Sequence, residues 1–398
     1  MGRSIAREAL DHGFVPILID WKPPDSKGEE EIKGIKFVVA DVRNENALQA
    51  IFDGVSIVFH VASYGMSGSS QLDRKLVKDV NVGGTEAVIR AATAAGVERL
   101  VFTSTYNVVF GGQSISCGDE SMPYFPKNKH PDVYSATKAM AEMMVLEANM
   151  TPLPTHTSGH MHAGGKTDES EEKRFLRTCA LRPAAIWGPQ EERHIPRVVR
   201  YIEKGLFKFT FGDPKAKMDF VHVQNLAQAH LLAAKGLGPA LHYVAAGDSY
   251  FISDGEEHAI NNFDFFKQLV DGLGFPPPRL WLPLWLVYLV ALVTEHLHRI
   301  LHPWISFEPL LTRAEVYKSG VNHWFTIAKA RRELGYTPEV YDFQDVIAVL
   351  RAKGHGSALA SSPSALHQGP STLMAMAFAG VLLAVGVWMA LNVERTHH

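Results

Sequence analysis

The chain has 398 residues, which is enough for a sizeable hydrophobic core and for two or three domains. Its 39 basic and 42 acidic residues give a formal net charge of -3 without any long basic block, which argues against nucleic acid as a partner. Only two cysteines occur, Cys117 and Cys179, so a disulfide framework is excluded and a reducing compartment is favoured.

The first part of the chain alternates short apolar strands with helices. A helix is expected to end at Gly13, and buried strands are predicted over residues 14–19, 35–41, 55–63 and 99–104. Helical spacing of apolar residues fills the intervening segments, and a long helix is predicted after Asp132. This alternation predicts an α/β fold, a doubly wound parallel sheet covered by helices on both faces.

The segment 151–173 is polar and lacks hydrophobic periodicity, which predicts a solvated surface loop. Three histidines in it, together with a run of acids, leave a metal site open as the alternative, but their irregular spacing favours the loop. The histidines are His156, His160 and His162. We therefore expect no bound metal.

Beyond this loop, the sequence TCALRPAAIWGP predicts a final sheet strand, and shorter mixed elements follow through about residue 350. We therefore expect a doubly wound domain over residues 1–180 and a smaller substrate-binding portion over residues 181–352.

Two hydrophobic stretches lie in the second half of the chain. Residues 280–294 carry no charge but are too short for a comfortable membrane crossing. A core helix and a helix at a membrane interface or substrate entrance stay equally open there.

Residues 373–393 give 21 positions without a charged side chain, which at ~1.5 Å per residue span about 30 Å. We predict a transmembrane helix there after a linker over 353–372, with a buried core helix as the alternative. More basic residues precede this stretch than follow it, which places the large domain in the cytosol.

Tyr134 and Lys138 stand four positions apart in the segment YSATK, so on a helix they share one face. A neighbouring lysine cation lowers the pKa of a tyrosine hydroxyl, and the resulting phenolate can act as a base near neutral pH. A hydroxyl from Thr105, in the strand end TST, is placed to hold a substrate oxygen while Tyr134 takes its proton. Loss of a hydride to a nicotinamide would then convert an alcohol to a ketone. By themselves, a tyrosine and a lysine at this spacing are common surface residues of a helix.

The wider sequence resembles the extended short-chain dehydrogenase/reductase family, and more closely its 3-beta-hydroxysteroid dehydrogenase-like members of the 42E branch. The matching pieces, in family order from Asp20 to about His230, are ADVRN, VFHVASYGMSG, VNVGGT, LVFTST, YSATKAMAE, LRPAAIWGP and DFVHVQNLAQAH. Weaker similarity continues to about residue 350. The resemblance implies a Rossmann domain that binds NAD and a steroid or sterol-like small molecule as substrate.

The resemblance also implies a role for each matching position. Tyr134 would accept or donate the proton, Lys138 would also hold the nicotinamide ribose, and Thr105 would replace a more usual serine. Asp20 would accept the ribose hydroxyls of the adenosine, which favours NAD over NADP. Further cofactor contacts would come from Asp41 and Val42 at the adenine, from Ala62, and from Pro183 and Ile186 beside the nicotinamide. The two aspartates have a simpler alternative as local cap, turn or loop residues.

Members of this family begin with a strand and a glycine-rich turn of the form TGxxGxxG, whose last glycine corresponds to Gly2 here. We expect that the first strand and most of this turn are missing from the chain as given, and that a longer form carries them. Without them the sheet lacks backbone partners and a pyrophosphate lacks amide donors, so weak dinucleotide binding is expected.

Together these patterns lead us to expect a membrane-anchored, NAD-dependent oxidoreductase that oxidises the 3-beta-hydroxyl of a steroid or sterol-like lipid. A nucleotide-sugar epimerase or dehydratase and a catalytically silent, membrane-tethered binding protein are the alternatives. The resemblance further implies the endoplasmic reticulum membrane and allows a homodimer.

Overall fold

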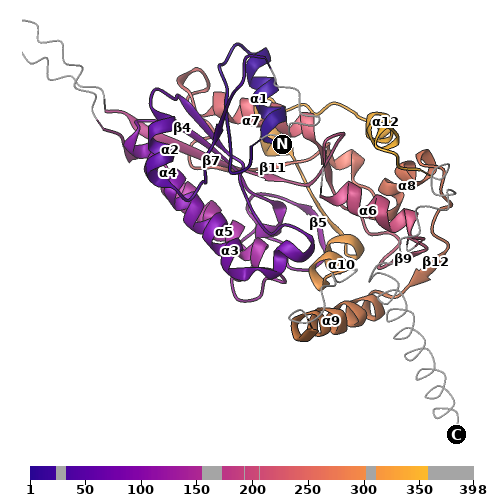
Figure 1. The fold of residues 1–398 in the computed structure, drawn as a ribbon. Coiled ribbons are helices and arrows are strands. Elements are labelled where there is room, and N and C mark those ends of the chain that lie inside the picture. Colours follow the sequence, from indigo (N-terminus) through magenta and orange to yellow (C-terminus); the bar gives the residue numbers. More distant parts are fainter. Residues whose placement is uncertain (24–32, 155–172, 192, 206, 302–310, 357–398) are drawn as a thin grey trace, which may run out of the picture.

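The computed structural model describes residues 1–23, 33–154, 173–191, 193–205, 207–301 and 311–356. Its largest sheet contains four parallel strands, namely β3 (Ile57–His60), β4 (Arg99–Thr103), β7 (Phe175–Pro183) and β11 (Ser249–Ile252). Their spatial order is β11-β7-β4-β3 (Figure 1). A short strand, β6 (Thr151–Pro152), pairs antiparallel with the start of β7.

Helices cover both faces of this sheet (Figure 1). One face carries α2 (Glu45–Phe52), α3 (Arg74–Lys78), α4 (Gly84–Ala94) and α5 (Val133–Glu147). The other carries α1 (Gly2–Asp11), α7 (Val223–Gly236) and α11 (Ala328–Leu334). Because successive strand residues point to opposite faces, Leu100 and Phe102 of β4 pack into the first layer and Val101 packs into the second. The predicted doubly wound parallel fold is thereby confirmed.

A separate parallel pair lies beside the large sheet, formed by β1 (Ile17–Asp20) and β2 (Lys36–Val39). Within the described residues, β1 pairs only with β2 and β3 pairs only with β4, so each has one edge without a ladder partner. The side chains of β1 are consequently only partly buried, although its sequence ILID is typical of a central strand.

A second region lies to the right of the sheet in Figure 1. Among the described residues it contains parallel ladders of β8 (Ala185–Trp187) with β10 (Phe220–His222), β9 (Phe209–Phe211) with β12 (Leu280–Leu282), and β5 (Ile115–Gly118) with β13 (His323–Phe325). Its helices are α6 (His194–Glu203), α8 (Asn262–Gly272), α9 (Leu284–Leu301), α10 (Arg313–Gly320) and α12 (Gln344–Ala352). Aromatic rings dominate its core, where Phe220 and Phe265 stack with centroids 3.5 Å apart.

The large-sheet domain and the second region are not consecutive in the sequence, contrary to the boundary expected at residue 180. β11, α7 and α11 follow that position but complete the large sheet and one of its covering layers. A central parallel strand needs a hydrogen-bonding partner on each side, and β11 is the second partner of β7. β7 is therefore not the final strand of the sheet.

Three of the predictions concern residues outside the described ranges. The linker over 353–372 lies mostly outside them, and the stretch 373–393 and the three histidines of the 151–173 loop lie wholly outside. No helix in the described ranges is both long and apolar enough to cross a membrane. The described residues also include no group of His, Cys, Asp and Glu side chains that could hold a metal ion.

Candidate active site

The carboxyl ends of the parallel strands carry most of the residues singled out from the sequence. Asp20 ends β1, Asp41 follows β2, and Ala62 follows β3. Thr105 follows β4, and Pro183 ends β7. In open α/β sheets, ligands bind outside the carboxyl ends of the strands. The fold therefore places these residues where a ligand site is expected.

Two carboxylates near the β1–β2 pair have different surroundings. Asp20 is exposed, and its Oδ1 accepts a hydrogen bond from the Lys22 backbone N–H at 3.1 Å. Asp41 accepts hydrogen bonds from Arg43, at 3.0 Å from Nε and 2.9 Å from the backbone N–H. The side-chain hydrogen bond from Arg43 holds the pKa of Asp41 below its usual value. A carboxylate can accept about four hydrogen bonds, so Asp20 retains capacity for a ligand.

Gly2 and Val42 take part in close packing next to the same strands. A Cβ at position 2 would lie 3.2 Å from Leu18 Cδ1, so glycine lets the start of α1 approach β1. A helix N-terminus favours an anion through its backbone N–H groups, and at this end of α1 the Ser4 and Ile5 N–H groups donate to the Met1 carbonyl at 2.9 and 3.1 Å. Val42 packs against the start of α4, where a Cβ on Gly84 would come within 2.9 Å of Val42 Cγ2.

Tyr134 lies in the first turn of α5, is buried, and lines a cavity. Asp132 caps this helix and accepts a hydrogen bond from Lys318 Nζ at 3.0 Å. Burial raises the pKa of Tyr134 to about 12; the charge of Arg193 and a hydrogen bond with Ser63 oppose this rise, and Asp132 adds to it. The Tyr134 phenol is therefore protonated at neutral pH in this structure.

Lys138 lies one helical turn beyond Tyr134 but points toward the sheet. Its Nζ donates to the Thr103 carbonyl at 2.5 Å and lies 3.9 Å from the centroid of the Phe102 ring. Burial lowers the pKa of Lys138 to about 7, and the charge of Glu142 opposes this shift. The expectation that Lys138 lowers the pKa of Tyr134 is wrong for this structure, because burial of the phenol dominates and the amine is bound elsewhere.

Thr105 and Asn107 form a hydroxyl–amide pair in the cavity wall. Thr105 Oγ1 accepts hydrogen bonds from Asn107 Nδ2 at 2.8 Å and from the Asn107 backbone N–H at 3.3 Å. With these acceptor positions filled, the Thr105 hydroxyl hydrogen is free to donate to a substrate oxygen. Our sequence analysis missed Asn107, although a threonine after a strand end readily forms such a turn with the residue two positions on.

A buried carboxylate behind these residues was also missed. Glu142 accepts hydrogen bonds from Arg182 at 2.9 Å (Nε) and 2.7 Å (Nη2), from Tyr124 Oη at 2.8 Å, and from the Ser104 hydroxyl. The Arg182 and Glu142 side chains are 4% and 0% exposed. This network joins α5 to β7 and to the residue preceding Thr105, so it holds the two hydroxyl-bearing elements together. The sequence carried no clear signal for this carboxylate, because Glu142 lies on a different face of the helix from Met140 and Met144, whose apolar spacing predicted that helix.

A cavity of about 240 Å³ brings part of the predicted site together. The predicted positions that line it are Thr105, Tyr134, Pro183 and Ile186. Lys138 and the predicted adenosine-side residues are not among its lining residues. The cavity therefore contains the hydroxyl groups expected to act on a substrate, but not the expected adenosine contacts.

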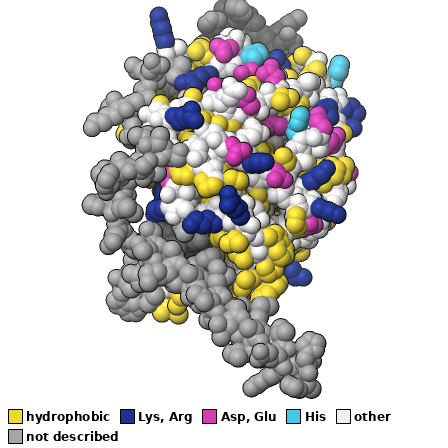
Figure 2. Space-filling model, turned by 90° about the vertical axis from the view of Figure 1, so that its right-hand side faces the viewer, with side chains coloured by type: hydrophobic (Ala, Val, Ile, Leu, Met, Phe, Trp, Pro, Cys, Tyr) yellow, Lys and Arg dark blue, Asp and Glu magenta, His cyan; other side chains and the backbone are white. Residues whose placement is uncertain are grey.

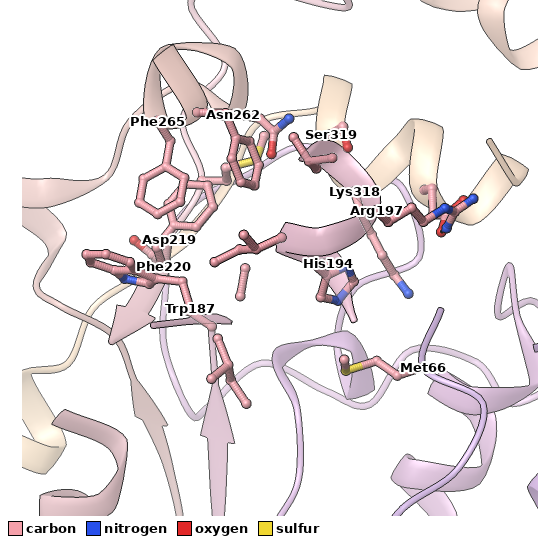
Figure 3. A pocket seen from close by; sticks show the side chains of 18 of the residues that line it. Met66, Trp187, His194, Arg197, Asp219, Phe220, Asn262, Phe265, Lys318 and Ser319 are labelled. Atoms are coloured by element: carbon pink, nitrogen blue, oxygen red, sulfur yellow. The ribbon is translucent and has the colours of Figure 1, made fainter. Parts of the chain in front are cut away.

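The rest of the cavity wall combines polar and charged residues with a large group of Phe and Trp rings, which the sequence analysis did not assign to the site. They are Trp187, Phe207, Phe209, Phe211, Phe220, Phe263, Phe265 and Phe266. Figure 3 shows Trp187, Phe220 and Phe265 on one side of the cavity and His194, Arg197 and Lys318 on the other.

Charged groups in the wall are mostly neutralised. Arg197 forms an ion pair with Glu315, and burial raises the pKa of Asp219 to about 8. Burial also lowers the pKa of His194, so its imidazole is neutral at neutral pH. The cavity therefore fits a largely apolar molecule with few polar groups.

Comparison with known sequences identifies the family to which the chain is related. Residues 9–284 match the sequence profile of the 3-beta hydroxysteroid dehydrogenase/isomerase family. The chain belongs to this family. Among its relatives is the human protein named short-chain dehydrogenase/reductase family 42E member 1, which is 46% identical over 96% of this chain and 91% of its own length. The resemblance inferred from the sequence is thus confirmed.

Solved structures share the fold of this 3-beta hydroxysteroid dehydrogenase/isomerase family member. The crystal structure of gox2253 has a TM-score of 0.65 at 23% identity and covers 90% of this chain and 97% of its own. MoeE5, solved in complex with UDP-glucose and NAD, has a TM-score of 0.60 at 20% identity and covers 88% of this chain and 95% of its own. At this level of identity the likeness shows the fold alone.

Proposed function

We propose that the protein is an NAD-dependent oxidoreductase that converts the 3-beta-hydroxyl of a steroid or sterol-like lipid to a ketone. The observation that carries the proposal is the presence of the Tyr134 and Thr105 hydroxyls in the wall of a cavity that many aromatic rings also line. Such a wall binds fused apolar rings, and two hydroxyl groups suffice to hold one substrate oxygen. Membership of the 3-beta hydroxysteroid dehydrogenase/isomerase family supports the same substrate class.

The residues at the strand ends fit NAD. The exposed carboxylate of Asp20 would accept the adenosine ribose hydroxyls, and the start of α1 at Gly2 would donate amides to the pyrophosphate. The protonated Lys138 amine has three N–H donors and donates one to the Thr103 carbonyl. The other two would be available to the nicotinamide ribose. Bound NAD supplies the acceptor for the hydride.

Tyr134 and Thr105 would control the protonation of the substrate oxygen. Thr105 donates a hydrogen bond to that oxygen, and Tyr134 exchanges a proton with it. Oxidation of the alcohol yields the ketone, reduced NAD and one proton. Because the pKa of Tyr134 lies at about 12, its phenol must lose a proton before it can act as a base. We therefore expect the oxidation rate to rise from pH 7 to pH 10, and the reverse reduction to lack this rise.

Activity of the full chain with NAD and a panel of 3-beta-hydroxysteroids, followed as formation of reduced NAD, tests the proposal. Replacing Tyr134 by phenylalanine should lower kcat/KM by about 10²–10⁴, because proton transfer to a positioned side chain contributes that much. Tyr243→Phe, at a half-exposed tyrosine, is the matched control and should leave the rate unchanged. Wild-type rates for Tyr134→Phe, or no turnover of any steroid, would count against the proposal.

The same assay separates the alternatives. A nucleotide-sugar enzyme would turn over UDP-sugars and not the steroids, which the aromatic cavity wall disfavours. A silent binding protein would turn over neither, and calorimetry would then report whether NAD binds at all.

Residues 373–393 would anchor this activity in a bilayer as a single transmembrane helix. Their lack of charge supports this placement, and the excess of basic residues before the stretch supports a cytosolic catalytic domain. The endoplasmic reticulum is the compartment that the family resemblance favours.

A further inference from the structure

Asp219 is a buried acid in the wall of the cavity. It immediately precedes β10 and is only 5% exposed. Figure 2 shows acidic and basic side chains on the outer face of the second region, where solvent can hydrogen-bond to them. Asp219 lacks such access to solvent, so its oxygens need partners within the protein or on a bound molecule.

The two oxygens of the Asp219 carboxyl group have different surroundings. Oδ2 accepts a hydrogen bond from the Phe325 backbone N–H at 2.6 Å. Oδ1 has no hydrogen-bond partner among the described residues. Asp254, on the loop after β11, shows the more usual arrangement, because it accepts hydrogen bonds from Asn225 Nδ2 at 2.7 Å and from Trp187 Nε1 at 2.9 Å. A buried oxygen without a partner is exceptional, and a molecule in the cavity can supply the partner that Oδ1 needs.

The surroundings of Asp219 favour its neutral form. Burial raises the pKa of Asp219 to about 8, and the negative charges of Glu256 and Asp254 add to this rise, whereas the hydrogen bond from the Phe325 N–H opposes it. At pH 7 most of the Asp219 side chains therefore carry a proton. Because Oδ2 accepts the hydrogen bond from Phe325, the proton belongs on Oδ1, which makes this atom a hydrogen-bond donor.

Asp219 lies on the side of the cavity away from the proposed reacting groups. Figure 3 shows it near Phe220, opposite Lys318. Lys318 Nζ donates to Asp132 at 3.0 Å, and Asp132 caps helix α5 just before Tyr134. Tyr134 is therefore on the Lys318 side. The cavity thus offers a phenol on one side and a carboxylic acid on the other.

Other polar groups of the cavity wall are less suited to bind a distant part of a substrate. Tyr106 Oη and His323 Nε2 are hydrogen-bonded to each other at 3.2 Å. Asn107 Oδ1 also lacks a partner among the residues that the structure describes, but the Asn107 amide donates to Thr105. Asn107 therefore belongs with the hydroxyl groups proposed to act on the substrate, which leaves Asp219 for the other end.

We propose that Asp219 is a specificity-determining residue that donates a hydrogen bond from Oδ1 to a second oxygen of the substrate, at the end of the molecule farthest from the reacting hydroxyl. That the substrate is a polycyclic alcohol rests on the function proposed above. A ketone or hydroxyl group on its far ring would pair with Asp219. A hydrocarbon group there would leave the buried acid unpaired, which lowers affinity by about 10–100-fold.

Equilibrium dialysis of the full chain with radiolabelled steroids at pH 7 tests this recognition without turnover. The probes are epiandrosterone, which has a ketone on its far ring, and androstan-3-beta-ol, which has only hydrogen there. Wild type should bind epiandrosterone about 10–100-fold more tightly than androstan-3-beta-ol. Asp219→Leu should lose this preference and still bind androstan-3-beta-ol, which shows that the cavity has formed. Asp213→Leu, at an exposed acid before the same strand, is the matched control and should keep the wild-type preference.

Asp219→Asn tests whether the acid acts as a donor. The amide oxygen would replace Oδ2 as the acceptor for the Phe325 N–H, which leaves Nδ2 to donate into the cavity. Asp219→Asn should therefore keep the preference for epiandrosterone. Loss of the preference in this variant, as in Asp219→Leu, would mean that a negative charge is needed and would contradict donation from Oδ1.

Two further results would overturn the proposal. One is equal affinity of wild type for the two steroids, a comparison that needs no substitution and so decides the matter even if Asp219→Leu does not fold. The other is an unchanged preference in a folded Asp219→Leu chain.

Oxidation rates separate this proposal from the proposed function. With NAD, wild type should show the same preference in kcat/KM as in dialysis. Oxidation of both steroids with equal kcat/KM would support the proposed function and overturn the role of Asp219. A preference in dialysis without any oxidation would support the role of Asp219 in binding and count against the proposed function.

Discussion

The β1–β2 pair and the strands β4 and β11 have similar sequences but different burial. Each is a short run rich in branched and aromatic apolar residues. β4 and β11 bury nearly every side chain, whereas Val39 of β2 is 56% exposed and the residues of β1 are half-buried or exposed. An apolar run thus determines which side chains can be buried. The strands and helices beside it determine how far each one is buried.

Two ion pairs, one beside each of these regions, differ in burial in the same way. Asp41 and Arg43, next to β2, have side chains that are 38% and 44% exposed, whereas Glu142 and Arg182, between α5 and β7, are 0% and 4% exposed. Each pair joins an arginine to a carboxylate through more than one hydrogen bond. Burial is the main difference, so we expect the energetic effect of breaking them to differ severalfold.

Breaking the buried pair should have the largest effect on stability. Glu142→Gln leaves the Arg182 guanidinium buried without a compensating charge, which typically costs about 3–5 kcal/mol. The midpoint of denaturant unfolding of the full chain, measured by circular dichroism, checks this. Glu147→Gln is the matched control, because Glu147 is on the same helix but exposed, and it should shift the midpoint little. Similar midpoints for the two variants would show that water reaches Glu142.

Lys138 is a buried amine that forms no ion pair with a carboxylate among the described residues. Replacing it should change the free energy of unfolding by an intermediate amount that depends on pH. The pKa of Lys138 is lowered to about 7 in the folded protein, against about 10.4 for an unfolded chain. Between these values the unfolded state binds more protons, so Lys138 makes the free energy of unfolding increase with pH.

Lys138→Met removes that dependence. From pH 7 to pH 10, wild type should gain about 3–4 kcal/mol over this variant, because each unit of pKa difference corresponds to about 1.4 kcal/mol, and below about pH 6 their difference should be constant. Lys127→Met, at an exposed lysine, serves as the reference and should show no such trend. A wild-type–variant difference that is flat from pH 7 to pH 10 would mean that Lys138 stays charged in the folded protein.

Local periodicity predicted the elements of the sheet but not all of their partners. The helix after Asp132 and the strand ending at Thr103 lie where the pattern put them, because each is defined by residues close in sequence. Thr105, Tyr134, Pro183 and Ile186 line one cavity, since strand ends and helix starts meet at one edge of the sheet.

Contacts between residues far apart in the sequence were not predicted. Glu142 and Arg182 are separated by 40 positions, and no local pattern joins them. The spacing of Tyr134 and Lys138 fixed their common helix face, but the Thr103 carbonyl, from another element, fixed where the amine points.

The exposed pair should show the smallest effect. Asp41→Asn removes the charge attraction to Arg43 but leaves both side chains in contact with water, so the loss of stability at pH 7 should stay below about 1 kcal/mol. Because Arg43 lowers the pKa of Asp41, this contribution is present above the ordinary carboxyl pKa and disappears as the pH falls through the folded value. Unfolding of wild type and variant should therefore coincide near pH 2. A loss at pH 7 as large as that of Glu142→Gln would mean that the β1–β2 pair is as closely covered in solution as the centre of the sheet, and the distinction between the two regions would fail.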